Sequence, residues 1–206
     1  SIQTPLTECE NDTTFNLIFE ELENLKLKVY VPSLFIHPSK RAKYEIDDSG
    51  SGGFDQMGRE LGIRRLMAIN LLKRLESSVY SFRLTIQLVK AYVNQTIKIV
   101  EEFQNHKNNS QINMKDLSFD ADYDFDDQNT TDIFAIGKKV QIDLNDMDYI
   151  SWLKDLKIDE SILSGLESLI EDITPENDSK LQELIKRISN KIENPINADN
   201  KKVIVF

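Results

Sequence analysis

The chain has very few of the residues on which disulfides, metal centres and nucleophilic catalysis depend. It contains one cysteine, Cys9, and two histidines, His37 and His106. A single cysteine excludes an internal disulfide framework. Two histidines that lie far apart in the sequence supply neither a zinc ligand set nor a Ser-His-Asp arrangement. The sequence therefore predicts no metal site and no catalytic residue.

Long apolar runs are also missing. No stretch approaches the ~18 apolar residues that indicate a membrane-spanning helix. The first residues, Ser1–Pro5, lack the charged and apolar regions of a signal peptide. We therefore expect a cytoplasmic protein without membrane contact. The chain has no initiating Met and ends inside the apolar run Val203–Phe206, so we expect both ends to be cut from a longer protein.

Positive charge is scarce. The 206 residues include 25 Lys and Arg against 35 Asp and Glu, which gives a formal net charge of -10. Nucleic-acid binders contact phosphates through clustered cations, so this composition argues against autonomous nucleic-acid binding. A phosphate loop is absent, because the nearest string, Ile136–Lys139, lacks the first glycine and the hydroxyl ligand. Enzyme activity stays uncertain, since any such activity would belong to a larger parent protein.

The chain does contain a long apolar repeat with helical spacing. Its members recur at steps of three and four residues, as in a helix packed along one seam. They are Ala68, Leu72, Leu75, Val79, Phe82, Ile86, Val89, Val93, Ile97 and Val100. We predict one helix over about 57–105, roughly 70 Å long. Ser77 and Ser78 mark the one plausible break, as a kink or an N-cap, with two helices in line as the second interpretation.

Other elements flank this repeat on its N-terminal side. Residues 12–14 offer N-caps for a short helix that continues to about Leu25. Two prolines make residues 29–44 an extended segment that packs through its aromatic side chains. The Gly/Ser-rich loop 47–53 separates this segment from the long helix.

Three helices and a strand are predicted on the C-terminal side. Two helices cover 146–156 and 159–173, and a third begins with Thr174 as its N-cap and runs to about Glu193. Residues 201–206 have the pattern of a buried strand, with no sheet in this chain to join. The fold class is therefore all-α, a helical bundle built on one long helix, with a terminal orphan strand.

An acidic tract lies within residues 116–145 and is interleaved with aromatic side chains. Its aspartates are Asp116, Asp120, Asp122, Asp124, Asp126, Asp127 and Asp132. A calcium loop that starts at Asp120 would place Phe125 where a glycine turns the chain and Thr131 where a bidentate Glu is needed. We therefore favour a solvated loop pinned by its aromatics. A further interpretation is that the tract screens a basic surface elsewhere in the parent protein.

Several strings resemble one family. Leu71–Ser78, which reads Leu-Leu-Lys-Arg-Leu-Glu-Ser-Ser, and Ser81–Thr85 after it resemble the helical segment between the two RecA-like motor lobes of superfamily II ATPases of the RapA-like, Swi/Snf-related kind. Asn177–Leu184 followed by Asn200–Phe206 is similar to the start of the second motor lobe in that family. Tyr30–Phe35 is similar to the family's Tyr-x-Pro-Ser segment.

The resemblance covers residues 29–44, 60–90 and 174–206 and has several implications. Residues 1–173 would be a helical inter-lobe or insertion domain, and 174–206 would be the lead-in helix and first strand of a C-terminal helicase lobe. The parent would be an ATP-dependent DNA helicase or translocase that uses ATP and Mg. The partners of this chain would be the flanking motor lobes and, through the parent, DNA. The cofactors would lie outside this chain.

A group of cations in the repeat supplies candidate contact residues. They are Arg64, Arg65, Lys73, Arg74 and Arg83. These side chains could touch a nucleic-acid backbone or pair with carboxylates of a motor lobe. Glu76 lies three residues from Lys73, so part of the group could instead pair within the helix.

Two other functions remain open from the sequence. One is a stand-alone helical protein-protein interaction module that binds through the long helix. The other is an acidic cation-binding module built on residues 116–132. The flanking coding sequence would distinguish the helicase interpretation from the stand-alone module, and a calcium titration would test the third hypothesis.

Overall fold

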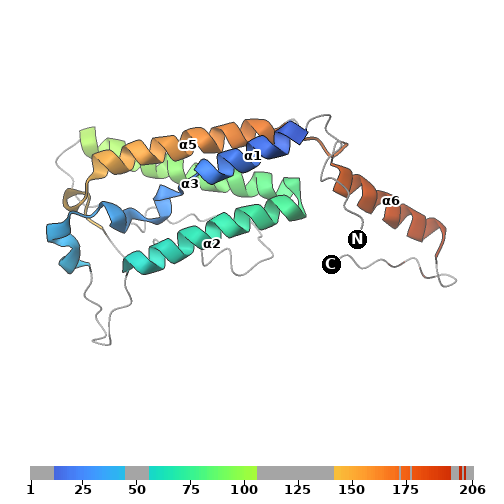
Figure 1. The fold of residues 1–206 in the computed structure, drawn as a ribbon, viewed down its shortest axis with the longest axis horizontal. Helices are drawn as coiled ribbons and strands as arrows, with labels where there is room; N and C mark the ends of the chain where they lie inside the picture. Colours follow the sequence, from blue (N-terminus) through green and yellow to red (C-terminus); the bar gives the residue numbers. More distant parts are fainter. Residues whose placement is uncertain are drawn as a thin grey trace.

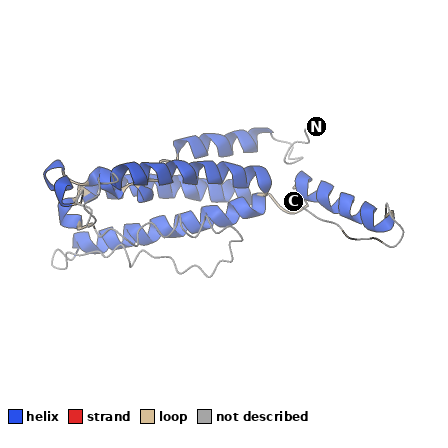
Figure 2. Ribbon diagram, turned by 90° about the horizontal axis from the view of Figure 1, so that it is seen from below, coloured by secondary structure: helices blue, strands red, loops and turns tan. Residues whose placement is uncertain are grey.

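The computed structural model describes residues 12–44, 56–105, 142–171, 173–176, 178–195, 200 and 202. Within these residues the fold is helical and contains no strand, which confirms the all-α bundle (Figures 1 and 2). The α-helices are α1 (Asp12–Asn24), α2 (Gln56–Ser77), α3 (Val79–Asn105), α5 (Tyr149–Glu171) and α6 (Ser179–Glu193). Four short 3-10 helices accompany them: η1 (Lys28–Tyr30), η2 (Pro32–Phe35), η3 (Pro38–Lys43) and η6 (Leu144–Asp146).

The prediction of one continuous helix over 57–105 is wrong. The chain breaks at Ser78, and α2 and α3 fold back on each other as a helical hairpin rather than lying in line (Figure 1). The hydroxyl Oγ of Ser78 accepts a 3.3 Å hydrogen bond from the Ser81 N–H, so Ser78 is the N-cap of α3. The predicted apolar repeat holds through α3 but only in part on α2. Leu75 and Val79 on either side of the turn are both buried, whereas Ala68 and Leu72 are exposed, because α2 turns Met67 and Leu71 into the core instead.

The predicted helices 146–156 and 159–173 are a single helix, α5. It packs along α3, and α1 packs along α5 near the C-terminal end of α5 (Figure 1). The α1 prediction is confirmed, with Ile18 fully buried at its inner face. The bundle core is one continuous cluster that includes Phe82, Ile86 and Leu163.

Residues 29–44, which follow α1, are not an extended segment, contrary to the prediction. The chain there forms η1, η2 and η3, because Pro32 and Pro38 occupy first helical positions, which proline's fixed φ favours. We call residues 25–44 the arm. Its η1 and η2 contact both α2 and α5, so the arm lies between these helices. Ile36 also makes an isolated antiparallel bridge with Met147.

Helix α6 starts later than predicted and stands beyond the end of the bundle (Figure 1). Thr174 is not its N-cap. Residues 175–176 form a turn, and the carboxylate of Asp178 caps α6 by accepting from the Leu181 N–H at 3.0 Å. On α6, Leu184, Ile185 and Ile192 remain exposed.

Some predicted features fall outside the described residues. They are the loop 47–53, the acidic loop 116–145 apart from its last four residues, and the strand 201–206 apart from Lys202. Among the helices that are described, none is long and apolar enough to cross a membrane.

Candidate nucleic-acid and lobe interface

Helix α2 carries four of the five candidate cations, and they divide between its two sides. Its inner side buries Met67, Leu71 and Leu75 against the bundle. At ~100° per residue, Arg65 and Lys73 lie on the opposite side, where both are exposed. The outer side of α2 is therefore where this chain could meet a phosphate backbone or an acidic surface.

Arg64 and Arg74 lie beside the buried row instead. Both side chains are half-buried, and Arg74 already makes an interaction within the protein. They do not join Arg65 and Lys73 in one patch. The helical pairing considered for Lys73 is absent from the described ion pairs, since none joins it to Glu76.

Arg83 on α3 has a different environment from the other four. Its guanidinium Nη2 donates to the main-chain carbonyl oxygens of Ile170, at 2.7 Å, and Ile173, at 2.9 Å. Ile170 lies in the last turn of α5, where its carbonyl also accepts from the Ile173 N–H, and Ile173 lies just beyond the helix. Cations are favoured at such a helix C-terminus. Arg83 therefore joins α3 to the point where the chain leaves the bundle.

The corner between α2 and α3 lies at this same end of the molecule. Lys180 of α6 donates through Nζ to the main-chain carbonyl of Glu76, in the last turn of α2. Leu71–Ser78 therefore lies at the corner between α2 and α3. The chain passes beside this corner on its way from Ile173 to α6. Sequence spacing could not have revealed this neighbourhood, because the contacts join residues about ninety to one hundred positions apart.

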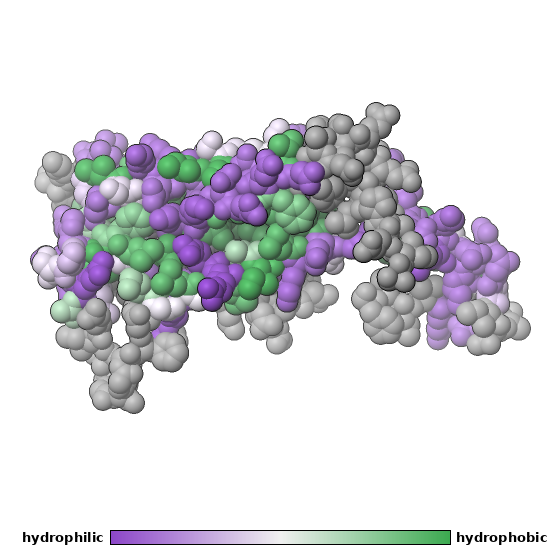
Figure 3. All heavy atoms as spheres, viewed as in Figure 1, coloured by the Kyte–Doolittle hydropathy of each residue, from purple (hydrophilic) through white to green (hydrophobic). Residues whose placement is uncertain are grey.

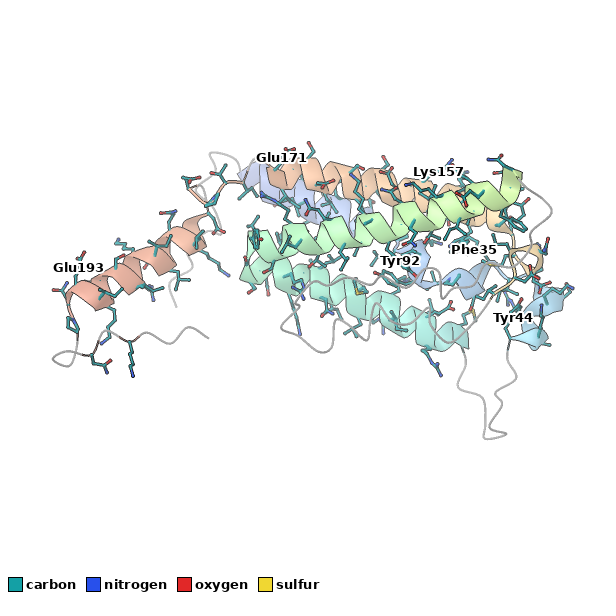
Figure 4. The ribbon with its side chains drawn as sticks, turned by 180° about the vertical axis from the view of Figure 1, so that it is seen from behind. Phe35, Tyr44, Tyr92, Lys157, Glu171 and Glu193 are labelled. Carbon is teal, nitrogen blue, oxygen red and sulfur yellow. The ribbon has the colours of Figure 1, made fainter. Side chains whose placement is uncertain are left out.

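Three buried carboxylates were not predicted, and all three hold the arm. Glu60 of α2, only 2% exposed, accepts from the backbone N–H of Ser33 at 2.9 Å and from its hydroxyl at 2.7 Å. Burial, and then the charge of Glu60, raises the pKa of Tyr92 to about 12. Tyr92 packs its ring 5.8 Å from that of Tyr30 and lies near the middle of the bundle (Figure 4).

Asp159 of α5 is 1% exposed and binds the start of the arm. It accepts from the main-chain N–H groups of Lys26, at 2.9 Å, and Lys28, at 2.6 Å. Burial raises the pKa of its carboxyl, against the lowering effect of these hydrogen bonds. The sequence predicts that a separate helix starts at Asp159, but α5 runs through this position. An aspartate is an ambiguous start signal, because its side chain can accept hydrogen bonds from another segment as readily as from its own helix.

Asp146 in η6 holds the far end of the arm. Its Oδ2 accepts from Lys43 Nζ and from the Tyr44 hydroxyl, each at 2.7 Å, and Lys40 Nζ lies 3.5 Å from Oδ1. The hydrogen bond from Lys43, followed by that from Tyr44, lowers the pKa of Asp146 to about 2. The three carboxylates are positioned to hold backbone and side chains, so their role here is structural.

The described residues offer no constellation suited to catalysis. They contain no group of three His, Cys, Asp or Glu side chains that could hold a metal ion. A hollow of about 560 Å³ lies on the outer side of α5 and is lined by residues of that helix alone, including Ile150, Lys154 and Ile158. It presents no convergent polar groups of the kind that orient a substrate.

No protein-family model, curated protein or solved structure matches this chain.

Proposed function

We propose that this chain is the helical connector between the two motor lobes of an ATP-dependent DNA helicase or translocase. The chain would carry no catalytic residue. ATP and Mg would bind between the lobes of the parent, and the connector would transmit lobe movement and contact DNA through α2. The proposal implies a cytoplasmic protein.

One observation carries the proposal. The string that bears the family resemblance, Leu71–Ser78, forms the α2–α3 corner next to the point where the chain leaves the bundle. Arg83 ties that corner to the end of α5, and Lys180 ties α6 to the end of α2. A segment that couples the movement of a helical domain to that of a following lobe needs such a joint of direct contacts between them, because coupling is carried by packed and hydrogen-bonded residues.

The path of the chain is compatible with this role. α1 begins at the end of the bundle where Glu171 closes α5, so the chain enters and leaves the bundle at one end (Figures 1 and 4). Tyr44 lies at the opposite end (Figure 4). The two termini of an inserted domain lie close together because both must connect to the domain into which it is inserted.

The coding sequence on both sides of the chain is the first test. We expect a phosphate loop upstream and a Gly-Arg-x-x-Arg-like motif downstream. Stop codons next to both ends would refute the connector and favour a stand-alone interaction module.

The second test uses the full-length parent. Arg83→Ala should lower DNA-stimulated ATP hydrolysis by about fivefold or more, the range of typical coupling between sites, while nucleotide binding is retained. Arg41→Ala is the matched control, because Arg41 is an exposed arginine on η3 away from the corner. Unchanged stimulation in a folded Arg83→Ala protein would contradict the proposed joint.

The apolar side of α6 supports a second candidate function, a protein-protein interaction module. Leu184, Ile185 and Ile192 are 37%, 47% and 42% exposed on one side of this short helix. In a connector this side would be covered by the following lobe, whereas in a module it would bind another protein. Crosslinking from Ser189 on α6 in the full-length protein distinguishes the two, since crosslinks within the same polypeptide favour the connector.

A further inference from the structure

Helix α2 carries exposed apolar side chains on the side turned away from the core. Leu66, Ile69 and Leu72 are 44%, 43% and 40% exposed. Residues three and four positions apart are neighbours on a helix surface, so Ile69 lies between Leu66 and Leu72 and between Arg65 and Lys73. The two cations are exposed as well. We call these five residues the outer face of α2.

The outer face does not take part in the packing of the bundle. In the core cluster of the described residues, α2 contributes Met67, Leu71 and Leu75, and no residue of the outer face belongs to it. Figure 3 shows hydrophobic surface among hydrophilic side chains over the part of the bundle in which Figure 1 places α2. Single exposed apolar residues are normal on protein surfaces, but a row of neighbouring ones usually marks a contact site.

Charge on the outer face specifies what kind of partner it fits. Among the described ion pairs, none joins Arg65 or Lys73 to a carboxylate. The apolar row favours a partner with apolar side chains, and the two cations select for carboxylates beside them. The same face of a second copy is a poor match, because it would bring like charges together.

The exposed apolar residues of α5 and α6 do not offer the same combination. On α5, Ile150 and Ile158 lie about two turns apart, so they do not form a row of neighbours. On α6, Arg187 already pairs with Glu183 at 2.8 Å, so positive and negative charge lie side by side. The outer face of α2 is the better site for a partner of one sign.

We propose that the outer face of α2 is the docking site for an acidic amphipathic helix of another protein. The row Leu66–Leu72 extends over about 9 Å of the α2 axis, and Arg65 and Lys73 lie about 12 Å apart along it. Apolar anchors at i, i+3, i+4 and i+7 of a bound helix extend over about 10 Å, so they cover the row. Carboxylates about two turns apart beside these anchors reach the two cations.

Nucleic acid is the weaker match for this face. Its phosphates would pair with Arg65 and Lys73, but its backbone offers no aliphatic surface to cover Leu66, Ile69 and Leu72. The docking goes beyond the proposed function and does not rest on it. In a connector, the acidic helix and DNA would compete for the same two cations, so the partner would reduce DNA binding through α2.

An NMR titration of the isotope-labelled 206-residue chain tests the docking. The probe is a synthetic peptide of about 18 residues, long enough to form a helix, with leucines at steps of three and four and glutamates on both flanks of that row. We expect shifts of the amide signals of Arg65, Ile69 and Lys73, and none around Lys154 on the outer side of α5. The absence of shifts on α2, or shifts around Lys154 instead, would overturn the proposal.

A matched peptide and matched variants test the charge selection. The same peptide with lysine in place of every glutamate should not bind. Arg65→Glu with Lys73→Glu should weaken binding of the acidic peptide by about tenfold or more, whereas Lys154→Glu should leave it unchanged. All three positions are exposed, so the fold should persist, and the dispersion of core amide signals checks this. Equal binding of the two peptides would refute the electrostatic match.

Ile69→Ser separates helix docking from attraction by charge alone. This change should weaken the acidic peptide by about fivefold or more, because the peptide buries Ile69, and should leave any binding of duplex DNA unchanged. Peptide binding that is insensitive to Ile69→Ser, or duplex DNA that binds more tightly than the peptide at about 0.15 M salt, would overturn the proposal. Peptide binding without DNA binding would support the docking site and count against DNA contact through α2.

Discussion

The carboxylate of Asp159 accepts a 2.6 Å hydrogen bond from the main-chain N–H of Lys28, 131 residues earlier in the chain. The same carboxylate accepts from the Lys26 N–H, and Leu27 between them has φ 52, in the left-handed region. A residue with a Cβ pays roughly 1–2 kcal/mol for that conformation. Asp159 therefore stabilises a strained turn that brings the buried side chain of Leu27 into the core.

Removal of this carboxylate should be costly. Asp159→Ala leaves two main-chain N–H groups without their acceptor, and we expect the free energy of unfolding to fall by about 2–4 kcal/mol. Urea unfolding followed by tryptophan fluorescence measures it well. Trp152 is the only tryptophan, is 2% exposed, and donates from Nε1 to the Lys28 carbonyl at 3.1 Å, so it reports on the same contact.

Asp155→Ala is the matched control for Asp159→Ala. Asp155 lies one turn earlier on α5 and pairs at 3.1 Å with the side-chain Nζ of Lys28 rather than with its backbone. A partly exposed ion pair of this kind contributes about 0–1 kcal/mol. Equal losses for the two variants would contradict the role assigned to the Asp159 hydrogen bonds.

The break between α2 and α3 can be tested with two adjacent serines. Ser78→Ala removes the hydroxyl that caps α3 and should destabilise the protein by about 1 kcal/mol, as is typical for an N-cap. Ser77→Ala changes an exposed residue at the end of α2 and should have an effect below about 0.5 kcal/mol. Thermal unfolding by circular dichroism measures both, and a larger loss at Ser77 would place the functional cap there instead.

Asp146 gives the arm a defined acid sensitivity. Its pKa is lowered to about 2 in the folded protein, from an ordinary value of 3.8, chiefly by the hydrogen bond from Lys43. A carboxyl with a lowered folded-state pKa contributes stability above its unfolded-state pKa and loses it as the pH falls through the folded value. The stability difference between wild type and Asp146→Asn should therefore be full at pH 6 and shrink between about pH 4 and pH 2.

The pH series needs an internal reference. Urea midpoints of the two proteins, compared at each pH, isolate the contribution of Asp146 from that of the other carboxylates. A difference that stays constant down to about pH 2 would show that the charge of Asp146 does not act on stability.

Two helical glycines offer sites for stabilisation. A Cβ added at Gly62 on α2 or Gly165 on α5 meets no heavy atom within 4 Å. Gly→Ala in a helix interior removes unfolded-chain entropy, so each change should add about 0.5–1 kcal/mol. Calorimetry should show a melting temperature higher by about 1–4 °C for a chain of this size. A decrease at either site would mean that the added methyl group meets a neighbour in solution.

Apolar spacing predicted the helices well and their junctions poorly. The predicted repeat is buried from Leu75 to Val100, but Ala68 and Leu72 are exposed, because α2 folds back and buries the neighbouring row of Met67 and Leu71. The break at Ser78 could not be read from the sequence with certainty, because serine occurs at helix interiors as well as at caps. Conversely, the chain between 156 and 159 contains no residue that ends a helix, and α5 runs through it.

The candidate site shows a similar limit. The sequence identified five cations, but their environments depend on contacts across the fold. Arg65 and Lys73 are exposed, whereas Arg83 donates to two carbonyls, at the end of α5 and just beyond it, about ninety residues later. The anchoring carboxylates Glu60 and Asp159 were missed because a carboxylate on an expected helix face usually lies in solvent.

The arm is held by carboxylates from three separate elements: Glu60 of α2, Asp146 of η6 and Asp159 of α5. The segment that ends at Tyr44 can be treated as a peptide ligand, and the rest of the chain as its receptor. Because the two are covalently attached, the effective concentration of the segment is of the order of mM. A single backbone cut between residues 45 and 55 should therefore leave two pieces that stay associated at high concentration and separate on dilution.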